Sequence, residues 1–280
     1  MLIPPSNILI VYAIASGGVS IAALFMAGYI PGIMVGLALM MVCYGYAKIK
    51  GYPLAPRLPL SVVFKKVLQA IPSLFLIILV IGGIVGGIFT PTEAGAIAVV
   101  YALLLAVVFY KEVALNALPG IMLKAAETTA IVMLLIAAST AMSWLLSFEN
   151  IPQTLSNALL TVSDNPLLIL LLINLLLIVV GAFLDMTPAV LIFTPIFLPV
   201  AMQLGMSELQ FGIMLVLNLS IGLCSPPVGA VLFITCAIAK TKLENIIKPL
   251  LPLYAAMFVV LMLITYVDWF SEALPRALGF

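Results

Sequence analysis

Long apolar runs alternate with short polar segments along most of the chain. An apolar run of about 20 residues is long enough to cross a bilayer as a helix. Such runs predict membrane spans at residues 21–47, 68–88, 94–110, 126–146, 210–239 and 250–269. Because 65% of the 280 residues are apolar and only 8% are charged, the chain cannot bury this surface within itself. The sequence therefore predicts an all-α polytopic membrane protein.

The charged residues predict how these spans are oriented. Basic residues gather at 48–66, 111–124 and 240–248, which the positive-inside rule assigns to the cytoplasm. The connections that contain acidic residues and no basic ones are predicted to lie outside, and these are residues 89–93, 148–165 and 204–209. The basic, amphipathic stretch 62–71 is expected at the cytoplasmic surface or in an interfacial arm.

A further apolar stretch, residues 166–203, is interrupted by GAFLDMTP at 181–188. Both of its flanks are predicted to lie outside, so it must enter and leave the membrane on the same face. We therefore predict a re-entrant hairpin with Asp185 and Thr187 at its tip. Thr187, directly before Pro188, is expected to be the N-cap of the second arm. A single broken span would instead place the three lysines of 240–248 outside.

The predicted span 210–239 contains CSPPVG at residues 224–229. Two adjacent prolines remove backbone donors and block a continuous helix. In lipid, the backbone groups that are freed must be satisfied by protein, water or an ion. The sequence therefore predicts a broken helix whose middle is buried in protein or lines a cavity.

An internal repeat relates the two ends of the chain. IPPSNILIVYAIA at 3–15 resembles SPPVGAVLFITCAIA at 225–239, and each copy is followed by one apolar span. The two copies run in opposite directions, and inverted repeats are typical of secondary transporters. The repeat divides the chain into the end of a first unit (1–48), a cytoplasmic basic loop (49–67) and a second unit (68–280). Because the first copy begins at its own break, we expect the C-terminal part of a longer protein, or a start at an internal Met.

The string GGIVGGIFTPTEAGA at 82–96 predicts a helix end followed by a new helix. Thr90 as N-cap, Pro91 and Glu93 form the pattern of a capping box. We therefore interpret Glu93 as a structural residue rather than a transport residue.

Several kinds of chemistry are disfavoured by composition. The chain has no His, and its cysteines (Cys43, Cys224 and Cys236) are far apart in apolar runs. Without paired intramembrane carboxylates, little is available for catalysis. Helix C-termini and free carbonyls favour a cation, and helix N-termini favour an anion. Hard oxygen ligands without a carboxylate cluster suit Na⁺ better than Ca²⁺ or a transition metal.

Four strings together closely resemble the large membrane subunit of tripartite ATP-independent periplasmic (TRAP) transporters. They are LIPPSNILIVYAIASG, GGIVGGIFTPTEAGAIAVVYAL, GAFLDMTPAVLIFTPIFLPVA and FGIMLVLNLSIGLCSPPVGAVLF. The resemblance implies a multi-pass bacterial inner-membrane protein with an elevator-type fold of re-entrant hairpins and broken helices. It implies Na⁺-coupled import of an organic anion such as a dicarboxylate, a keto acid or sialic acid. The implied partners are a periplasmic binding protein and a small membrane subunit.

The same resemblance assigns residues to the transport site, with Na⁺ as the coupling ion and no other cofactor. It implies that Na⁺ lies between the hairpin tip and the second break, held by Gly181, Asp185, Thr187, Ser225, Pro226 and Gly229. It implies that the anion contacts Ser6, Asn7, Asn218 and Pro227. Because the tip offers no Arg or Lys, the anion is expected to be held by helix N-termini and hydroxyls.

Other functions remain open on the sequence. A divalent anion–sodium symporter would have a similar architecture and work without a binding protein. A membrane enzyme is disfavoured by the missing chemistry. An inactive fragment, or an assembly subunit with no substrate of its own, is the third alternative.

Overall fold

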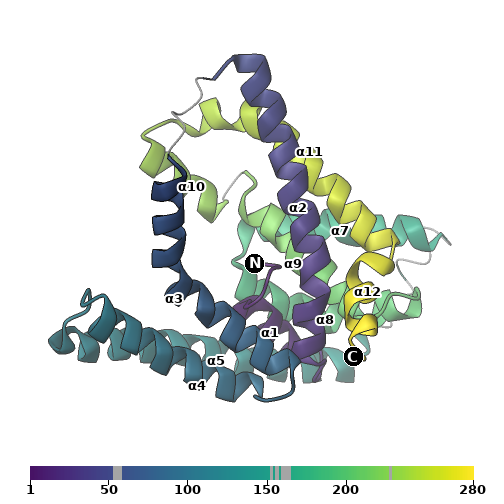
Figure 1. Cartoon of the computed structure of the whole chain (residues 1–280). Helices are drawn as coiled ribbons and strands as arrows, with labels where there is room; N and C mark the ends of the chain where they lie inside the picture. Colours follow the sequence, from purple (N-terminus) through teal and green to yellow (C-terminus); the bar gives the residue numbers. More distant parts are fainter. Residues whose placement is uncertain (53–58, 152–153, 155–157, 159–164, 227–228) are drawn as a thin grey trace. The chain divides into compact units, whose positions relative to one another are not determined.

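The computed structural model describes residues 1–52, 59–151, 154, 158, 165–226 and 229–280, and the regular elements in these ranges are helical (Figure 1). The helices are α1 (Asn7–Ala15), α2 (Ile21–Lys50), α3 (Leu60–Val85), α4 (Pro91–Leu103), a π-helical turn (Leu104–Phe109), a 3₁₀ turn (Leu115–Ala117), α5 (Leu118–Phe148), α7 (Pro166–Phe183), α8 (Met186–Gln203), α9 (Glu208–Leu223), α10 (Ala230–Ala239), α11 (Leu243–Tyr266) and α12 (Trp269–Ala277).

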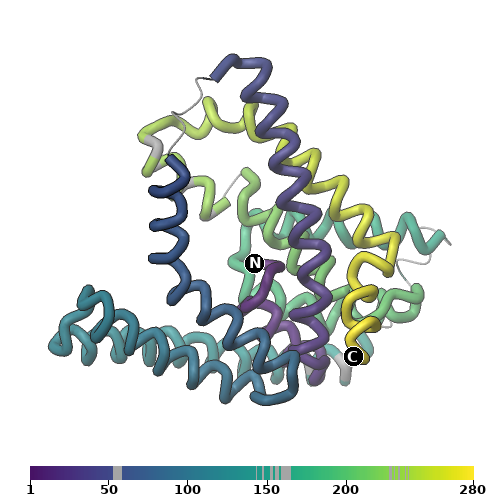
Figure 2. The backbone as a smooth tube through the Cα atoms, viewed as in Figure 1, coloured from purple at the N-terminus to yellow at the C-terminus, as the bar shows by residue number. Residues whose placement is uncertain are grey.

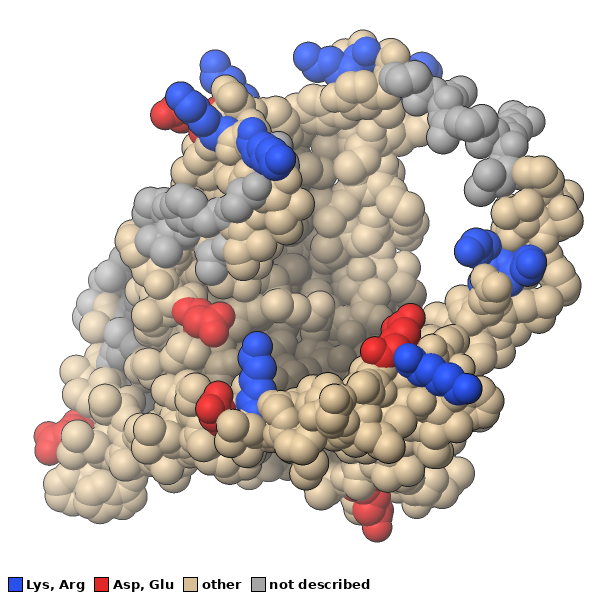
Figure 3. Space-filling model, turned by 90° about the vertical axis from the view of Figure 1, so that its left-hand side faces the viewer, with Lys and Arg blue, Asp and Glu red and all other residues tan. Residues whose placement is uncertain are grey.

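Within the described residues, seven helical segments are long and apolar enough to cross a membrane. The face of the molecule in Figure 3 agrees with this, since charged side chains occupy only a few places on a mostly uncharged surface. The predicted all-α polytopic fold is confirmed. The orientation of the loops and the re-entry of 166–203 stay predictions.

The chain forms two compact units, one made of residues 1–46 with 132–280 and the other of residues 47–131. In the smaller unit, α3 packs against α4, and the Tyr101 hydroxyl donates to the Pro72 carbonyl at 2.8 Å. The predicted capping box is confirmed. The Thr90 backbone N–H donates to the Glu93 carboxylate at 2.8 Å, and the Glu93 N–H donates to Thr90 Oγ1 at 3.3 Å.

In the larger unit, α9 is the central helix. Every residue of α9 from Gln210 to Leu223 is buried except Ser220, which is half-buried. A helix that is apolar on all sides needs neighbours on all sides. Here α1, α7, α8, α11 and α12 all contact α9, and Figure 2 follows the backbone through this group.

Glycines set the crossing of α7 and α9. A Cβ added at Gly222 would lie 2.6 Å from the Gly181 Cα and 2.8 Å from the Ile178 carbonyl oxygen. Only a residue without a side chain allows the two backbones to approach this closely. Gly181 is therefore a packing residue here, and its position brings the end of α7 to the end of α9.

Several predicted boundaries differ from the structure. The basic stretch 62–71 forms the first part of α3, which begins at Leu60, and its place at the cytoplasmic surface or in an interfacial arm stays a prediction. The predicted loop 111–124 is partly helical, since α5 begins at Leu118. The last predicted span, 250–269, begins at Leu243 and ends at Tyr266. In each case the helix begins earlier than the predicted span, because backbone hydrogen bonding continues through the charged residues that precede the apolar run.

Candidate functional site

A cavity of about 390 Å³ lies between the start of α1 and the start of α8. Its polar lining comes from Ser6 and Asn7 on one side and from Asp185 and Thr187 on the other. The structure thus brings together four predicted site residues that are far apart in the sequence. Among the described residues that line the cavity, none is a lysine or an arginine.

The first side of the cavity is the N-terminus of α1. Ser6 is the N-cap residue, with extended backbone, but its side chain makes no capping hydrogen bond. The residue is only 5% exposed, and its Oγ has no hydrogen-bond partner among the described residues. Buried hydroxyls nearly always have a partner. The Ser6 hydroxyl is therefore a buried polar group for which the described residues supply no partner.

The second side is the N-terminus of α8, at the predicted hairpin tip. The tip is confirmed as the place where the stretch 166–203 divides into two helices, since α7 ends at Phe183 and α8 begins at Met186. The predicted N-cap was wrong. Asp185, not Thr187, caps the helix, and its carboxylate accepts from the Met186 N–H at 2.9 Å.

Proline chemistry explains why the cap lies earlier than predicted. The first turn of a helix has N–H groups without intrahelical partners, so Pro188 fits inside that turn at no cost in hydrogen bonds. The carboxylate of Asp185 is also one of the strongest N-caps. The helix consequently begins before Pro188, and Thr187 lies within its first turn.

The predicted break in 210–239 is confirmed, because α9 ends at Leu223 and α10 begins at Ala230. Ser225 Oγ donates to the Ile221 carbonyl at 2.7 Å, and the Ser225 N–H donates to the Gly222 carbonyl at 2.8 Å. Pro226 is half-buried, whereas Pro227 lies outside the described residues.

Two carbonyl oxygens lie close to Gly229 at the end of this break. A Cβ on Gly229 would lie 2.6 Å from the Ser225 carbonyl oxygen and 3.3 Å from that of Leu223. Gly229 also has a positive φ of 24°, and its N–H donates to the Ala182 carbonyl at 3.3 Å. This last bond joins the break directly to the end of α7. The predicted meeting of hairpin tip and break is therefore seen at Ala182 and Gly229.

Asn218, predicted to contact the substrate, lies elsewhere. It is fully buried in α9 and donates through Nδ2 to the Oδ1 of Asn174 in α7. Asn174 donates in turn to the Leu170 carbonyl at 2.8 Å and to Thr265 Oγ1 at 3.2 Å. The structure does not place Asn218 in the lining of the cavity. It places the residue in a polar network that ties α7, α9 and α11 together.

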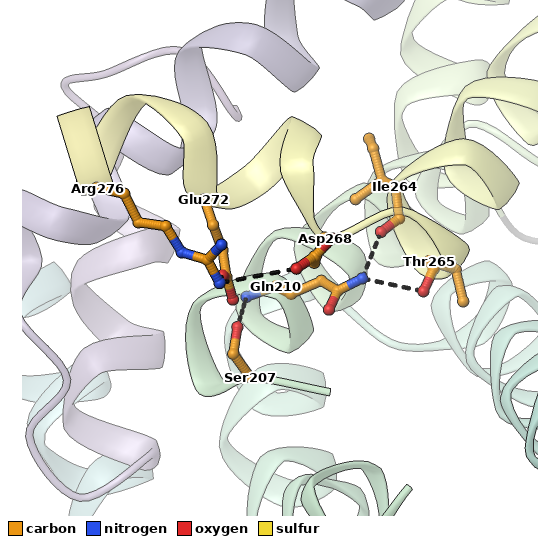
Figure 4. Close-up of polar contacts among 7 residues, drawn as sticks. All are labelled: Ser207, Gln210, Ile264, Thr265, Asp268, Glu272 and Arg276. Carbon is orange, nitrogen blue, oxygen red and sulfur yellow. Dashed lines mark hydrogen bonds and ion pairs between the residues drawn. The ribbon is translucent and has the colours of Figure 1, made fainter. Parts of the chain in front are cut away.

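This network continues to the start of α9, shown in Figure 4. Gln210 Nε2 donates to the carbonyls of Ile264 and Thr265 at 2.9 and 3.0 Å, which satisfies carbonyls at the end of α11. Nearby, Arg276 pairs with Glu272 in α12 and lies 3.7 Å from Asp268. These contacts hold the end of α9 that is opposite the break.

Two residues near the site escaped the sequence analysis. The Tyr254 hydroxyl of α11 donates to the Cys224 carbonyl at the break. Asn174 forms the interhelical pair with Asn218. Both are isolated polar residues in long apolar runs, and in a membrane protein that position is itself a signal of a specific partner.

Comparisons with known proteins identify the family. Residues 1–270 match the family model described as the tripartite ATP-independent periplasmic transporter, DctM component. The chain is 38% identical over 279 residues to the C4-dicarboxylate TRAP transporter large permease protein of Pseudomonas aeruginosa, covering 100% of this chain and 65% of that protein. It is 39% identical over 275 residues to the sialic acid TRAP transporter large permease protein of Vibrio cholerae, covering 98% and 64%.

An uncharacterized protein of Salmonella typhimurium is more similar still, at 50% identity over 275 residues, with 98% of this chain and 63% of that protein covered. The chain thus spans about 63 to 65% of the length of these relatives. With seven candidate spans in the part of the chain that the structure describes and this kinship, it is a multi-pass protein of the bacterial inner membrane. The chain belongs to the DctM family, the large permease component of TRAP transporters.

Proposed function

We propose that this chain forms part of the permease of a Na⁺-coupled importer of an organic anion. The observation that carries the proposal is the cavity in which two helix N-termini meet and Ser6 has a buried hydroxyl that finds no partner among the described residues. The chain spans only part of the length of its relatives, so the proposal concerns the whole transporter that contains it.

The anion binds in this cavity, near the N-termini of α1 and α8. The N-terminal end of a helix carries about half a positive elementary charge and presents free N–H donors. Ser6 and Asn7 add a hydroxyl and an amide. A carboxylate is the group that best fits such donors, and carboxylates are common to the substrates named for the dicarboxylate and sialic acid relatives.

Na⁺ binds at the adjoining break, where carbonyl oxygens gather around Gly229 and the C-terminal end of α9 is negative. The backbone that positions these carbonyls includes Gly181, Ser225 and Pro226. Further oxygen ligands come from the hairpin tip, from Asp185 and Thr187. The Asp185 carboxylate repels an anion in the same cavity, and no basic residue among the described lining compensates it. A cation is therefore required before the anion binds well, and this requirement couples the two.

The partners follow from the tripartite family. A periplasmic binding protein delivers the anion, and a small membrane subunit completes the permease. Transport proceeds by alternating access, in which the hairpin and broken helices move as an elevator-type core. The anion is a dicarboxylate, a keto acid or sialic acid. The carboxylate-binding cavity accepts each of these, so the binding protein makes the choice between them.

Family membership favours this function over a divalent anion–sodium symporter, which needs no binding protein. The Pseudomonas aeruginosa and Vibrio cholerae relatives are named as transporter permeases rather than enzymes. Uptake into proteoliposomes with and without the binding protein distinguishes the TRAP permease from the symporter. Uptake that needs no binding protein would support the symporter. A chain that binds neither Na⁺ nor the anion would be an assembly subunit.

The central test is Asp185→Asn in the reconstituted transporter. Asn is as good an N-cap as Asp, so this variant keeps the start of α8 while it removes the charge. We expect the Na⁺ concentration for half-maximal uptake to rise about tenfold, as for the loss of one charge-assisted contact. Asp185→Ala should show the same rise and also lose about 1 kcal/mol of stability with the cap.

Asp268→Asn is the matched control. Asp268 is also an aspartate next to a helix start. Among the described residues, its side chain makes only the exposed ion pair with Arg276, and such pairs contribute little. Uptake by this variant should have the same Na⁺ dependence as the unmodified transporter. If Asp185→Asn behaved in the same way, Asp185 would not belong to the Na⁺ site.

A further inference from the structure

A tyrosine from a neighbouring helix holds the backbone at the break. Tyr254 of α11 donates its hydroxyl to the carbonyl of Cys224, the residue that directly follows the last residue of α9. We propose that Tyr254 is a positioning residue, which fixes the peptide geometry of the break and so the affinity of the carbonyl cluster for Na⁺. The inference rests on the proposed function, because it concerns the ion that this cluster holds.

The hydrogen bonds show how the tyrosine acts on the break. The carbonyl of Cys224 and the N–H of Ser225 belong to one planar peptide group. Tyr254 holds the carbonyl side of this plane, and the Gly222 carbonyl accepts from its N–H side at 2.8 Å. A peptide plane held at both edges cannot rotate freely. The orientation of the neighbouring carbonyls is thereby restricted.

The two carbonyls on either side of this plane are those that converge on Gly229. They belong to Leu223 and Ser225, one residue before and one residue after Cys224. A cation site selects by the number and placement of its oxygens, so a rotation of the plane between them changes both distances to the ion. Tyr254 does not reach the ion in this arrangement. It sets the positions of groups that do.

The position of α11 supports this role. Helix α11 contacts both halves of the broken helix, α9 and α10. Tyr254 thus lies on a helix that contacts both α9 and α10, and it donates a side-chain hydrogen bond into the gap between them. Without the hydroxyl, the half-buried Cys224 carbonyl would lose its donor and the plane would be free to turn.

Tyr254→Phe tests the inference, because phenylalanine fills the same space and removes only the hydroxyl. Tyr12→Phe is a matched control. Tyr12 also donates its hydroxyl to a backbone carbonyl of α9, that of Glu208 at 2.7 Å, but at the opposite end of the helix. Both variants lose one tyrosine-to-carbonyl hydrogen bond, and only one of them loses it at the break.

The measurement is the thermal unfolding of the purified permease during titration with NaCl, with choline chloride keeping the ionic strength constant. Na⁺ that binds the folded protein raises its melting temperature. For Tyr254→Phe, we expect the Na⁺ concentration for half-saturation, obtained by fitting this rise for the dissociation constant, to increase about threefold to tenfold, the range for one lost hydrogen bond. For Tyr12→Phe, we expect it to be unchanged.

Each other outcome overturns the inference. A lower melting temperature of Tyr254→Phe at every Na⁺ concentration, with the same half-saturation, would mean that the tyrosine only stabilises the fold. An equal shift in both variants would mean that the effect is not specific to the break. No stabilisation of the unmodified permease by Na⁺ would overturn the proposed Na⁺ coupling, and the inference with it.

Should Tyr254→Phe unfold during purification, uptake by intact cells gives the second measurement. The same increase in the Na⁺ concentration for half-maximal uptake, with an unchanged KM for the anion at saturating Na⁺, is expected there. An increase in the anion KM alone would contradict the assignment to the Na⁺ site.

Discussion

The two breaks of the chain have similar sequences and different surroundings. Each contains a pair of prolines and leads into a short helix, α1 with 9 residues and α10 with 10. Each short helix is followed by a longer one that contains proline, α2 with Pro31 and α11 with Pro249 and Pro252. The inverted repeat predicted from the sequence therefore has a counterpart in the order and length of the helices.

The two short helices, α1 and α10, are buried to different extents. In α1, Leu9 and Tyr12 are fully buried, and the helix contacts α8 and α9. In α10, Ile234 and Ile238 are 61% and 78% exposed. One repeat thus lies within the packed core of its unit, whereas the other covers that core from the side. Similar sequences pack differently because their neighbours differ.

The two breaks also differ in whether their polar groups have hydrogen-bond partners. At the first break, the Ser6 hydroxyl has no partner among the described residues. At the second, Ser225, Cys224 and Gly229 bond to α9, α11 and α7 respectively. A break whose groups are free is suited to receiving a ligand with its own acceptors. A break whose groups are tied is suited to holding carbonyls at fixed places around an ion.

The largest effect should come from a substitution that disrupts the close packing of α7 against α9, which brings the hairpin tip to the second break. In Gly222→Ala, the new methyl group would lie 2.6 Å from the Gly181 backbone, so α7 and α9 must separate. We expect a loss of about 1–3 kcal/mol, the usual cost of overpacking, measured by thermal unfolding. Because separation also stretches the bond from Gly229 to Ala182, stabilisation by Na⁺ should disappear.

Gly36→Ala in α2 is the control for Gly222→Ala. Gly36 is also a helical glycine, but a Cβ added there meets no atom within 4 Å. We expect the Gly36→Ala variant to gain less than about 1 kcal/mol in its free energy of unfolding, since alanine is the better helix former. If both glycine variants behaved alike, close helix packing at Gly222 would not be what positions the tip.

A narrower effect, on stability alone, is expected at the buried amide pair. Asn218→Ala removes the closer of two donors to Asn174 Oδ1 and leaves the Thr265 hydroxyl at 3.5 Å, and such a loss costs about 1–3 kcal/mol. Because Asn218 does not line the cavity, the KM for the anion should stay the same. Uptake kinetics together with thermal unfolding check both statements. A raised KM at unchanged stability would restore the substrate contact that the sequence suggested.

The difference between Asn218 and Ser6 shows how far sequence reasoning reaches. Apolar runs and prolines predict the spans, the tip and the break, because lipid imposes strict rules on length and on backbone hydrogen bonds. The meeting of Ser6 with Asp185 was anticipated only through family resemblance, since it depends on long-range packing of α1 against α8. Asn218 lies only a few residues before the break, but its side chain faces α7 rather than the cavity. Sequence spacing does not reveal which neighbour a polar side chain will face.

The smallest effect on stability, and the sharpest test of the comparison, is expected for Ser6→Ala. Because the hydroxyl has no partner among the described residues, its removal should change the free energy of unfolding by less than about 0.5 kcal/mol. The KM for the anion should nevertheless rise about tenfold, since a hydrogen bond to a charged group is lost from the complex.

Ser16→Ala at the other end of α1 is the control, because Ser16 Oγ donates to the Ala13 carbonyl at 3.2 Å and lines no part of the cavity. It should leave the KM unchanged. A Ser6→Ala variant that lost stability and kept its KM would show that the hydroxyl has a structural partner. The first break would then resemble the second, with its polar groups bound within the protein, and the anion would have to bind elsewhere.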